Sequence, residues 1–182
     1  VVYGEGMAIL AGDGLLTEAF ALLAAEPQDP ALADRKIRTI RAVAAAAGAC
    51  GMVGGQAIDL LAVGSATTFT AQSLQDMHAR KTGALIRAAA VAGAIMAGGP
   101  DESIRAVEEY GRHLGLAFQI VDDILDVEGE ANALGKTAGK DAKAGKPTYP
   151  SIHGLDASRR LAAERHDSAL AALNDAGLQH SR

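Results

Sequence analysis

The chain has 182 residues, of which 49% are hydrophobic and 21% are charged, a balance that predicts a single globular domain over residues 1–182. Its formal net charge of -5 excludes a general attraction to nucleic acid or to anionic membranes, so any anion-binding site must be local. The single cysteine, Cys50, excludes an internal disulfide and favours a reducing, cytoplasmic setting. Because it lies in a run of alanine and glycine, we interpret it as a buried packing residue.

Helix-forming residues dominate the sequence, β-branched alternation is absent, and aromatic residues make up only 3%. The sequence therefore predicts an all-α protein. In chain order, helices are expected over residues 5–24, 34–61, 72–97, 101–128 and 156–176. Turn-forming residues separate these segments. The last break, residues 129–150, exceeds the roughly 12–15 residues usual for a structureless loop, which is typical of functional or disordered segments.

No targeting or membrane segment is expected. The apolar stretch AAAVAGAIMAGG after Arg87 is shorter than the roughly 20 residues that a membrane-spanning helix needs. No basic segment precedes an apolar core at the start of the chain, so no signal peptide is visible. We therefore expect a soluble protein without stable membrane insertion. Both ends of the sequence resemble cuts within a longer protein.

Three aspartates, Asp122, Asp123 and Asp126, close the apolar segment FQIVDDILDVEG. At about 100° per residue on a helix, Asp122 and Asp126 lie roughly 40° apart and Asp123 lies about 60° from Asp126, so all three carboxylates are expected on one flank. Carboxylates beside apolar residues are costly to bury unless a cation compensates them. The pattern therefore predicts a cation at this flank.

The break that follows these aspartates carries four lysines, Lys136, Lys140, Lys143 and Lys146. Direct pairing of lysine with aspartate at a surface contributes little. A diphosphate bridged by Mg²⁺ uses both groups better, because Mg²⁺ takes one or two carboxylates together with phosphate oxygens while lysines supply charge to the remaining oxygens. We therefore predict Mg²⁺ and a diphosphate as the ligands.

Further upstream, Lys81 and Thr82 begin an apolar helical stretch in which Gly83 permits close approach. Gln119 lies about one turn before the aspartates and is expected to face the same cavity. Neither feature indicates a function by itself. The histidines lack metal-ligand spacing and are interpreted as surface or packing residues.

Several motifs together resemble bacterial trans-isoprenyl diphosphate synthases of the farnesyl and geranylgeranyl type. The similar segments cover nearly the whole chain: YGEGMAILAGDGLL, GGQAIDL, KTGALIRAAA, YGRHLGLAFQIVDDILDVEG, LGK and GKPTYP. The resemblance implies an isoprenoid-synthase-type helical bundle around a central cavity, a homodimer, and isopentenyl and allylic diphosphates as substrates.

The resemblance also implies roles for single residues. The second aspartate-rich motif of the family, which holds Mg²⁺ against the allylic diphosphate, corresponds to Asp122, Asp123 and Asp126. Family lysines at the substrate site correspond to Lys81, Lys136 and Lys146, of which the first two would contact that diphosphate. Thr82 and Gln119 would line the reacting carbons beside Lys81.

The implied reaction is Mg²⁺-assisted ionisation of the allylic diphosphate followed by condensation with isopentenyl diphosphate. The first aspartate-rich motif of the family is expected before Val1, so the chain corresponds to about the C-terminal two-thirds of a longer synthase, and we expect it to be inactive alone. Two alternatives stay open. One is a non-catalytic partner subunit of a prenyl diphosphate synthase, and the other is a terpene cyclase or head-to-head synthase of the same fold.

Overall fold

The computed structural model describes residues 2–62, 69–129 and 146–178, within which every regular element is a helix. The prediction of an all-α protein is confirmed. The elements in chain order are α1 (Glu5–Ala25), η1 (Pro30–Leu32), α2 (Ala33–Ala47), α3 (Met52–Ala62), α4 (Ala71–His78), η2 (Ala79–Gly83), α5 (Ala84–Met96), α6 (Asp101–Gly129), α8 (Tyr149–His153) and α9 (Leu155–Asp175).

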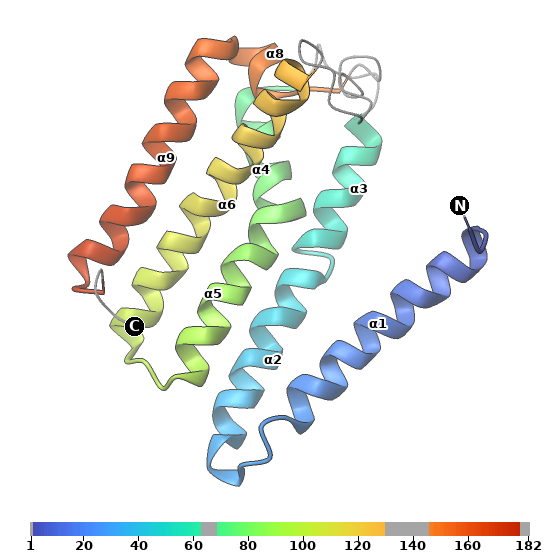
Figure 1. Cartoon of the computed structure of the whole chain (residues 1–182), viewed down its shortest axis with the longest axis vertical. Helices are drawn as coiled ribbons and strands as arrows, with labels where there is room; N and C mark the ends of the chain where they lie inside the picture. The colour runs from blue at the N-terminus through green and yellow to red at the C-terminus, as the bar shows by residue number, and fades with distance from the viewer. Residues whose placement is uncertain (1, 63–68, 130–145, 179–182) are drawn as a thin grey trace.

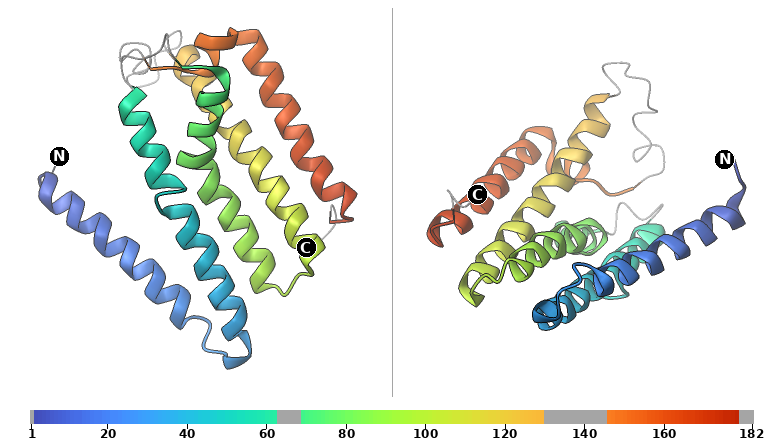
Figure 2. Two further views of the ribbon diagram at one scale, coloured as in Figure 1. Left: turned by 180° about the vertical axis from the view of Figure 1, so that it is seen from behind. Right: turned by 60° about the horizontal axis from the view of Figure 1, so that its bottom comes forward.

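The long helices lie side by side in chain order, from α1 at one edge to α9 at the other (Figure 1). Helix α6 packs between α5 and α9, and α5 packs in turn on α2. Two further views show the same order, with α1 and α9 at opposite sides (Figure 2). Short connections, such as the one between α5 and α6, favour antiparallel packing of successive helices. The ends of α3 and α6 and the short α8 therefore meet at one end of the molecule (Figure 1).

Two of the predicted helices are interrupted. The segment expected as one helix over 34–61 breaks between α2 and α3, at residues 48–51. A side chain at Gly51 would come within 2.0 Å of the carbonyl oxygen of Ala46, so the backbone folds back on α2 there in a way that only glycine permits. Cys50 lies in this interruption and is exposed, so its interpretation as a buried packing residue is wrong.

The other interruption is the π-helical turn η2, which lies inside the helix expected over 72–97. The predicted break over 129–150 also contains the start of a helix that was not expected, because α8 begins at Tyr149. Thr148 caps this helix through a reciprocal pair of hydrogen bonds with Ser151. Residues 130–145, including Lys136, Lys140 and Lys143, lie outside the described residues.

The largest buried cluster lies where α4, α6 and α8 meet, and it consists of Leu74, Met77, Leu116, Ile120, Ile124 and Tyr149. Glycines bring α6 close to the helix beside it. A side chain on Gly111 would lie 2.8 Å from the Cα of Arg87, and one on Gly115 would lie 2.8 Å from the Cα of Gly83. The packing of α6 therefore depends on backbones in direct contact.

Two stretches of the described chain, Glu5–Ala25 and Pro30–Ala62, are long and apolar enough to cross a membrane by length and composition. The expectation that no stretch reaches spanning length is wrong, because it counted only uninterrupted apolar runs. In α1, only Asp13, Thr17 and Glu18 interrupt a segment that is otherwise apolar or glycine after Glu5. Core helices of soluble proteins meet the same criteria, so these two stretches are weak evidence for a membrane.

Candidate active site

Lys81 and Thr82 lie in the π-helical turn η2, and both are half-buried. Such turns widen a helix locally and are frequent at functional sites. Two neighbouring helices approach this turn through glycine. A side chain on Gly55 of α3 would lie 2.2 Å from the backbone nitrogen of Lys81, and Gly115 of α6 contacts Gly83 as described above. The π turn therefore lies between α3 and α6 and contacts the backbone of both.

Asp59 follows Gly55 by one turn of α3 and reaches Lys81. Its carboxylate is buried, with 6% of the side chain exposed. The Nζ atom of Lys81 donates a hydrogen bond to Oδ2 of Asp59 at 2.7 Å. The Nζ atom of Lys146 donates to the same Oδ2 at 3.1 Å and lies 3.4 Å from Oδ1. Three side chains from α3, η2 and the segment before α8 thus form one group, which we call the Asp59 cluster.

The Asp59 cluster carries a net positive charge. Burial alone would raise the pKa of Asp59, but the hydrogen bonds and charges of Lys81 and Lys146 hold this pKa below its ordinary value, so the carboxylate stays ionised. Each lysine ammonium has three donors. Within the described ranges neither ammonium binds an acceptor other than Asp59, so donors remain for a ligand. The arrangement can bind an anion.

The three aspartates of α6 do not share one flank, contrary to the expectation from their spacing. Asp122 is exposed and Asp126 is half-buried, whereas Asp123 is only 6% exposed. Consecutive residues on a helix are separated by about 100°, which turns Asp123 toward the core on the side of Gln119. Gln119 is also buried, with 8% exposed. Two carboxylates therefore point outward and the third points inward.

Asp123 binds the backbone that leads into α8. Its Oδ2 accepts a hydrogen bond from the backbone N–H of Tyr149 at 2.8 Å. Lys146 lies three residues earlier, and the capping bonds of Thr148 with Ser151 fix the chain between them. Through Tyr149, the inward carboxylate of α6 thus holds in place the segment that delivers Lys146 to Asp59.

Asp122 and Asp126 lie one turn apart and make no hydrogen bond or ion pair with another described residue. In the part of the chain that the structure describes, no group of three or more His, Cys, Asp or Glu is arranged to hold a metal ion by itself. Mg²⁺ commonly binds one or two carboxylates and completes its shell with water and substrate phosphates. This pair of carboxylates therefore fits a Mg²⁺ ion that arrives with a diphosphate.

His78 precedes the π turn and packs against Tyr149, with ring centroids 5.6 Å apart. Burial and, to a lesser degree, the positive charge of Lys81 lower the pKa of His78 to about 4. The ring is therefore neutral at neutral pH. Its position agrees with the interpretation of the histidines as surface or packing residues.

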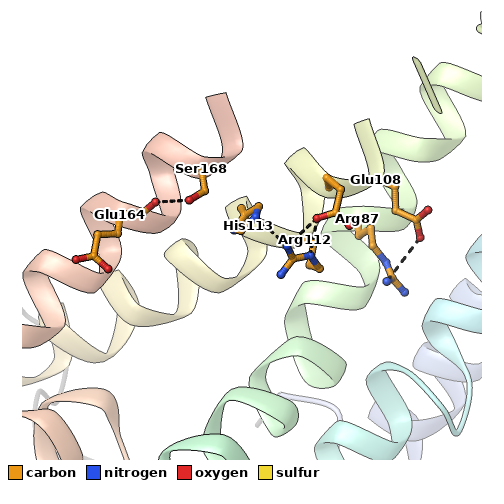
Figure 3. A network of polar contacts seen from close by, with 7 residues as sticks. Arg87, Glu108, Arg112, His113, Glu164 and Ser168 are labelled. Atoms are coloured by element: carbon orange, nitrogen blue, oxygen red, sulfur yellow. Dashed lines mark hydrogen bonds and ion pairs between the residues drawn. The ribbon is translucent and has the colours of Figure 1, made fainter. Parts of the chain in front are cut away.

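A second group of charges lies on the outer surface of α5 and α6 (Figure 3). Arg112 donates to Glu109 at 2.7 Å and contacts a ring nitrogen of His113 at 2.8 Å. Arg87 pairs with Glu108 at 3.7 Å. The ion-paired side chains are between 44% and 53% exposed. We call Arg87, Glu108, Glu109 and Arg112 the surface network.

The structure thus brings Lys81 and Lys146 together, places Thr82 in the same turn, and separates Asp123 from the two outward aspartates. Lys136 lies outside the described residues. The sequence-based interpretation overlooked Asp59. A signal for it was present, because Asp59 is the only charged residue of α3, and a lone carboxylate in an apolar helix needs a compensating cation.

A model of the polyprenyl synthetase family matches residues 1–176. The chain is 42% identical to a farnesyl diphosphate synthase from Bacillus subtilis over 158 residues, which cover 87% of this chain and 53% of the relative. It is 43% identical to a geranylgeranyl diphosphate synthase from Cyanophora paradoxa over 162 residues, which cover 89% of this chain and 53% of that relative. The chain spans about half the length of the curated relatives it matches.

Solved structures are similar along almost the whole chain. A putative farnesyl-diphosphate synthase from Marinomonas sp. MED121 matches with a TM-score of 0.80 and 34% identity, covering 97% of this chain and 59% of that one. A geranyltransferase from Helicobacter pylori, complexed with magnesium and isoprenyl diphosphate, matches with a TM-score of 0.81 and 29% identity, covering 98% and 56%.

Proposed function

The chain belongs to the polyprenyl synthetase family, and on that premise we propose that the complete protein containing it condenses isopentenyl diphosphate with an allylic diphosphate. The observation that carries this proposal is the Asp59 cluster. Two lysines far apart in the sequence meet at one buried carboxylate and keep donors for an anion. The outward aspartates of α6 supply the matching carboxylates for Mg²⁺.

In the proposed reaction, Lys81 and Lys146 donate hydrogen bonds to the diphosphate of the allylic substrate. They stabilise the negative charge that develops on this group as the carbon–oxygen bond breaks. Asp122 and Asp126 would hold Mg²⁺, which when bound supplies Lewis-acid stabilisation of the same departing charge. Lys136, which the family resemblance places at the same diphosphate, remains a prediction.

The double bond of isopentenyl diphosphate then attacks the allylic carbon, a carbon–carbon bond forms, and the released diphosphate takes the proton. No side-chain base is required. This fits the pKa of about 4 of the buried His78, the histidine closest in sequence to Lys81, because so low a pKa makes its ring a weak base. Thr82 and Gln119 are proposed to face the reacting carbons. Because both side chains are uncharged, neither brings a carboxylate that could attack the allylic cation.

We also propose that two copies of the complete protein associate. Helix α1 has no buried residue, and large apolar side chains surround its whole circumference, including Met7, Ile9, Leu10, Leu15 and Leu16. A helix that is apolar on all sides is normally covered by protein or by lipid. If the protein is a homodimer that does not insert into a membrane, light scattering in the absence of detergent should give the mass of two chains. A monomer that requires detergent would contradict it.

The function is tested by incubating the complete protein with radiolabelled isopentenyl diphosphate, Mg²⁺ and allylic diphosphates of one to three isoprene units. We expect a longer prenyl diphosphate that disappears when EDTA removes the metal. No metal-dependent product with any of these primers would contradict the proposal. A non-catalytic partner subunit would instead give no product alone and would change the product of an added synthase.

A further inference from the structure

Asp59 is a buried charge in the proposed site, yet its sign is wrong for a direct role. A carboxylate repels a diphosphate, so Asp59 cannot bind the substrate itself. Both of its oxygens already face lysine ammonium groups, at 2.7 Å from Lys81 and at 3.1 and 3.4 Å from Lys146. Asp59 therefore acts on the chemistry through these two lysines.

We propose that Asp59 is a positioning residue that holds the ammonium groups of Lys81 and Lys146 at one point, ready to bind a single diphosphate. This inference rests on the function proposed above. It assigns to Asp59 a task that neither lysine can perform, because two ammonium groups repel each other and would separate without a negative charge between them.

The physical advantage is preorganisation. Lysine has a flexible stem with about 2 kcal/mol of rotamer entropy, and part of that entropy is lost whenever its ammonium group is fixed. When one carboxylate oxygen binds both ammonium groups before the substrate arrives, this loss no longer weakens substrate binding. The second partner group of Asp59 comes from a distant part of the chain, so the pair exists only in the folded protein.

The surroundings of Asp59 hold the cluster in place from three sides. Gly55 lets the backbone of Lys81 approach α3 so closely that the next turn of α3 brings Asp59 to the lysine. Asp123 binds the backbone N–H of Tyr149 and so anchors the segment of Lys146. Asp59 itself is 5% exposed, whereas the side chains of Lys81 and Lys146 are 31% and 25% exposed and stay accessible to a ligand.

The test is the affinity of the complete protein for a non-ionisable allylic diphosphate analogue in the presence of Mg²⁺, measured by titration calorimetry. In Asp59→Asn we expect the Kd for the analogue to rise about tenfold, which corresponds to one lost hydrogen bond to a charged group. The Kd for isopentenyl diphosphate should stay within about twofold, because a local positioning role does not reach a second substrate site.

The sign of the change distinguishes positioning from simple charge balance. Asp59→Asn makes the site more positive, so if Asp59 only neutralised excess charge the analogue would bind more tightly. An unchanged or lower Kd would overturn the proposal. A structural role alone would lower the unfolding temperature but would leave both affinities of the folded variant unchanged. Asp76→Asn, in an exposed aspartate of α4, is the matched control and should bind like the wild type.

A double-mutant cycle with Lys146→Met tests whether Asp59 acts through the lysine. We expect the combined variant to lose less affinity than the product of the two separate losses, and fully multiplicative losses would overturn the inference.

If Asp59→Asn does not fold, Asp59→Glu keeps the charge but displaces it, and the Kd for the analogue should rise about threefold. Wild-type affinity in Asp59→Glu would then overturn it. Inactive wild-type protein would instead refute the proposed function.

Discussion

The Asp59 cluster and the surface network contain similar ion pairs in opposite settings. In the Asp59 cluster a carboxylate that is 6% exposed binds two lysines from different elements. In the surface network the pairs lie on α5 and α6, and their side chains are about half exposed. Exposed pairs contribute about 0–1 kcal/mol, while the desolvation of buried ions offsets much of their attraction. Neither setting is a strong source of stability, so the burial of charge around Asp59 is better explained by ligand binding.

The largest effect is expected at Asp122, an exposed carboxylate in the proposed Mg²⁺ site that should matter for activity and not for stability. Asp122→Ala should lower turnover of the complete protein by at least about a hundredfold, because one of two proposed Mg²⁺ ligands is lost. The free energy of unfolding should change by less than about 0.5 kcal/mol, since Asp122 is exposed and makes no hydrogen bond or ion pair with another described residue.

Steady-state kinetics and urea unfolding of the same preparation measure both quantities for Asp122→Ala. Asp167→Ala, in an exposed aspartate of α9, is the matched control and should change neither. If Asp122→Ala destabilises the protein and leaves turnover intact, the carboxylate is structural and the proposed metal site is wrong.

A change of pH should affect the buried region through His78. Its pKa is about 4 in the folded protein and has its ordinary value of 6.5 in the unfolded chain, so the unfolded chain binds a proton first as the pH falls. Through His78, the free energy of unfolding does not change above about pH 6.5. It falls by about 3 kcal/mol as the pH is lowered from about 6.5 to 4. The lowered pKa of Asp59 adds a further loss only below its ordinary value of 3.8.

Urea unfolding at a series of pH values measures this loss. In His78→Asn the slope below about pH 6.5 should become much shallower, and the part that remains is expected from His113, whose pKa is also lowered, mainly by burial. His166→Asn changes an exposed histidine and should keep the wild-type slope. A slope that is the same in His78→Asn and in the wild type would contradict the prediction.

A third test compares neighbouring aspartates of α6. Asp123→Ala should lower the free energy of unfolding by about 2 kcal/mol, because the backbone N–H of Tyr149 loses a charged acceptor in a buried setting. Asp123→Asn should cost less, since the amide oxygen still accepts this bond. Thermal unfolding distinguishes the two variants. If Asp123→Ala leaves the free energy of unfolding unchanged and lowers turnover as much as Asp122→Ala, Asp123 is a metal ligand and not a structural residue.

The smallest effect is expected in the surface network. Arg112→Ala should change the free energy of unfolding by less than about 0.5 kcal/mol, because its pair with Glu109 is exposed and both residues lie on one helix. The difference from the wild type should shrink further in about 1 M salt, which screens exposed charges. If Arg112→Ala lowers the free energy of unfolding by more than about 2 kcal/mol and salt does not reduce this loss, exposure does not distinguish the surface network from the Asp59 cluster.

Much of the fold follows from the sequence because helix formation is largely local. Helices α1, α6 and α9 lie within a few residues of the predicted ranges, since their composition and flanking turn residues act over short distances. The interruptions inside the segments 34–61 and 72–97 were not predicted. At the first, Gly51 lies against the backbone of Ala46 only five residues earlier, and helix propensity alone does not reveal this break. At the second, Gly55 and Gly115 contact the backbone of the π turn from distant parts of the chain, so the contact exists only after the helices are in place.

For the candidate site, the sequence by itself determined which groups are available: clustered aspartates, lysines and the family motifs that contain them. Only the tertiary structure decided which side chains meet. Helical angles placed Asp123 with Asp122 and Asp126, but the packing of α6 against α8 turned Asp123 inward to Tyr149. Asp59 gained Lys81 through the packing of α3 against η2, and Lys146 through the segment that leads into α8. The physical reason is that spacing sets the direction of a side chain on its own helix, whereas burial and charge pairing depend on neighbours that arrive from distant parts of the chain.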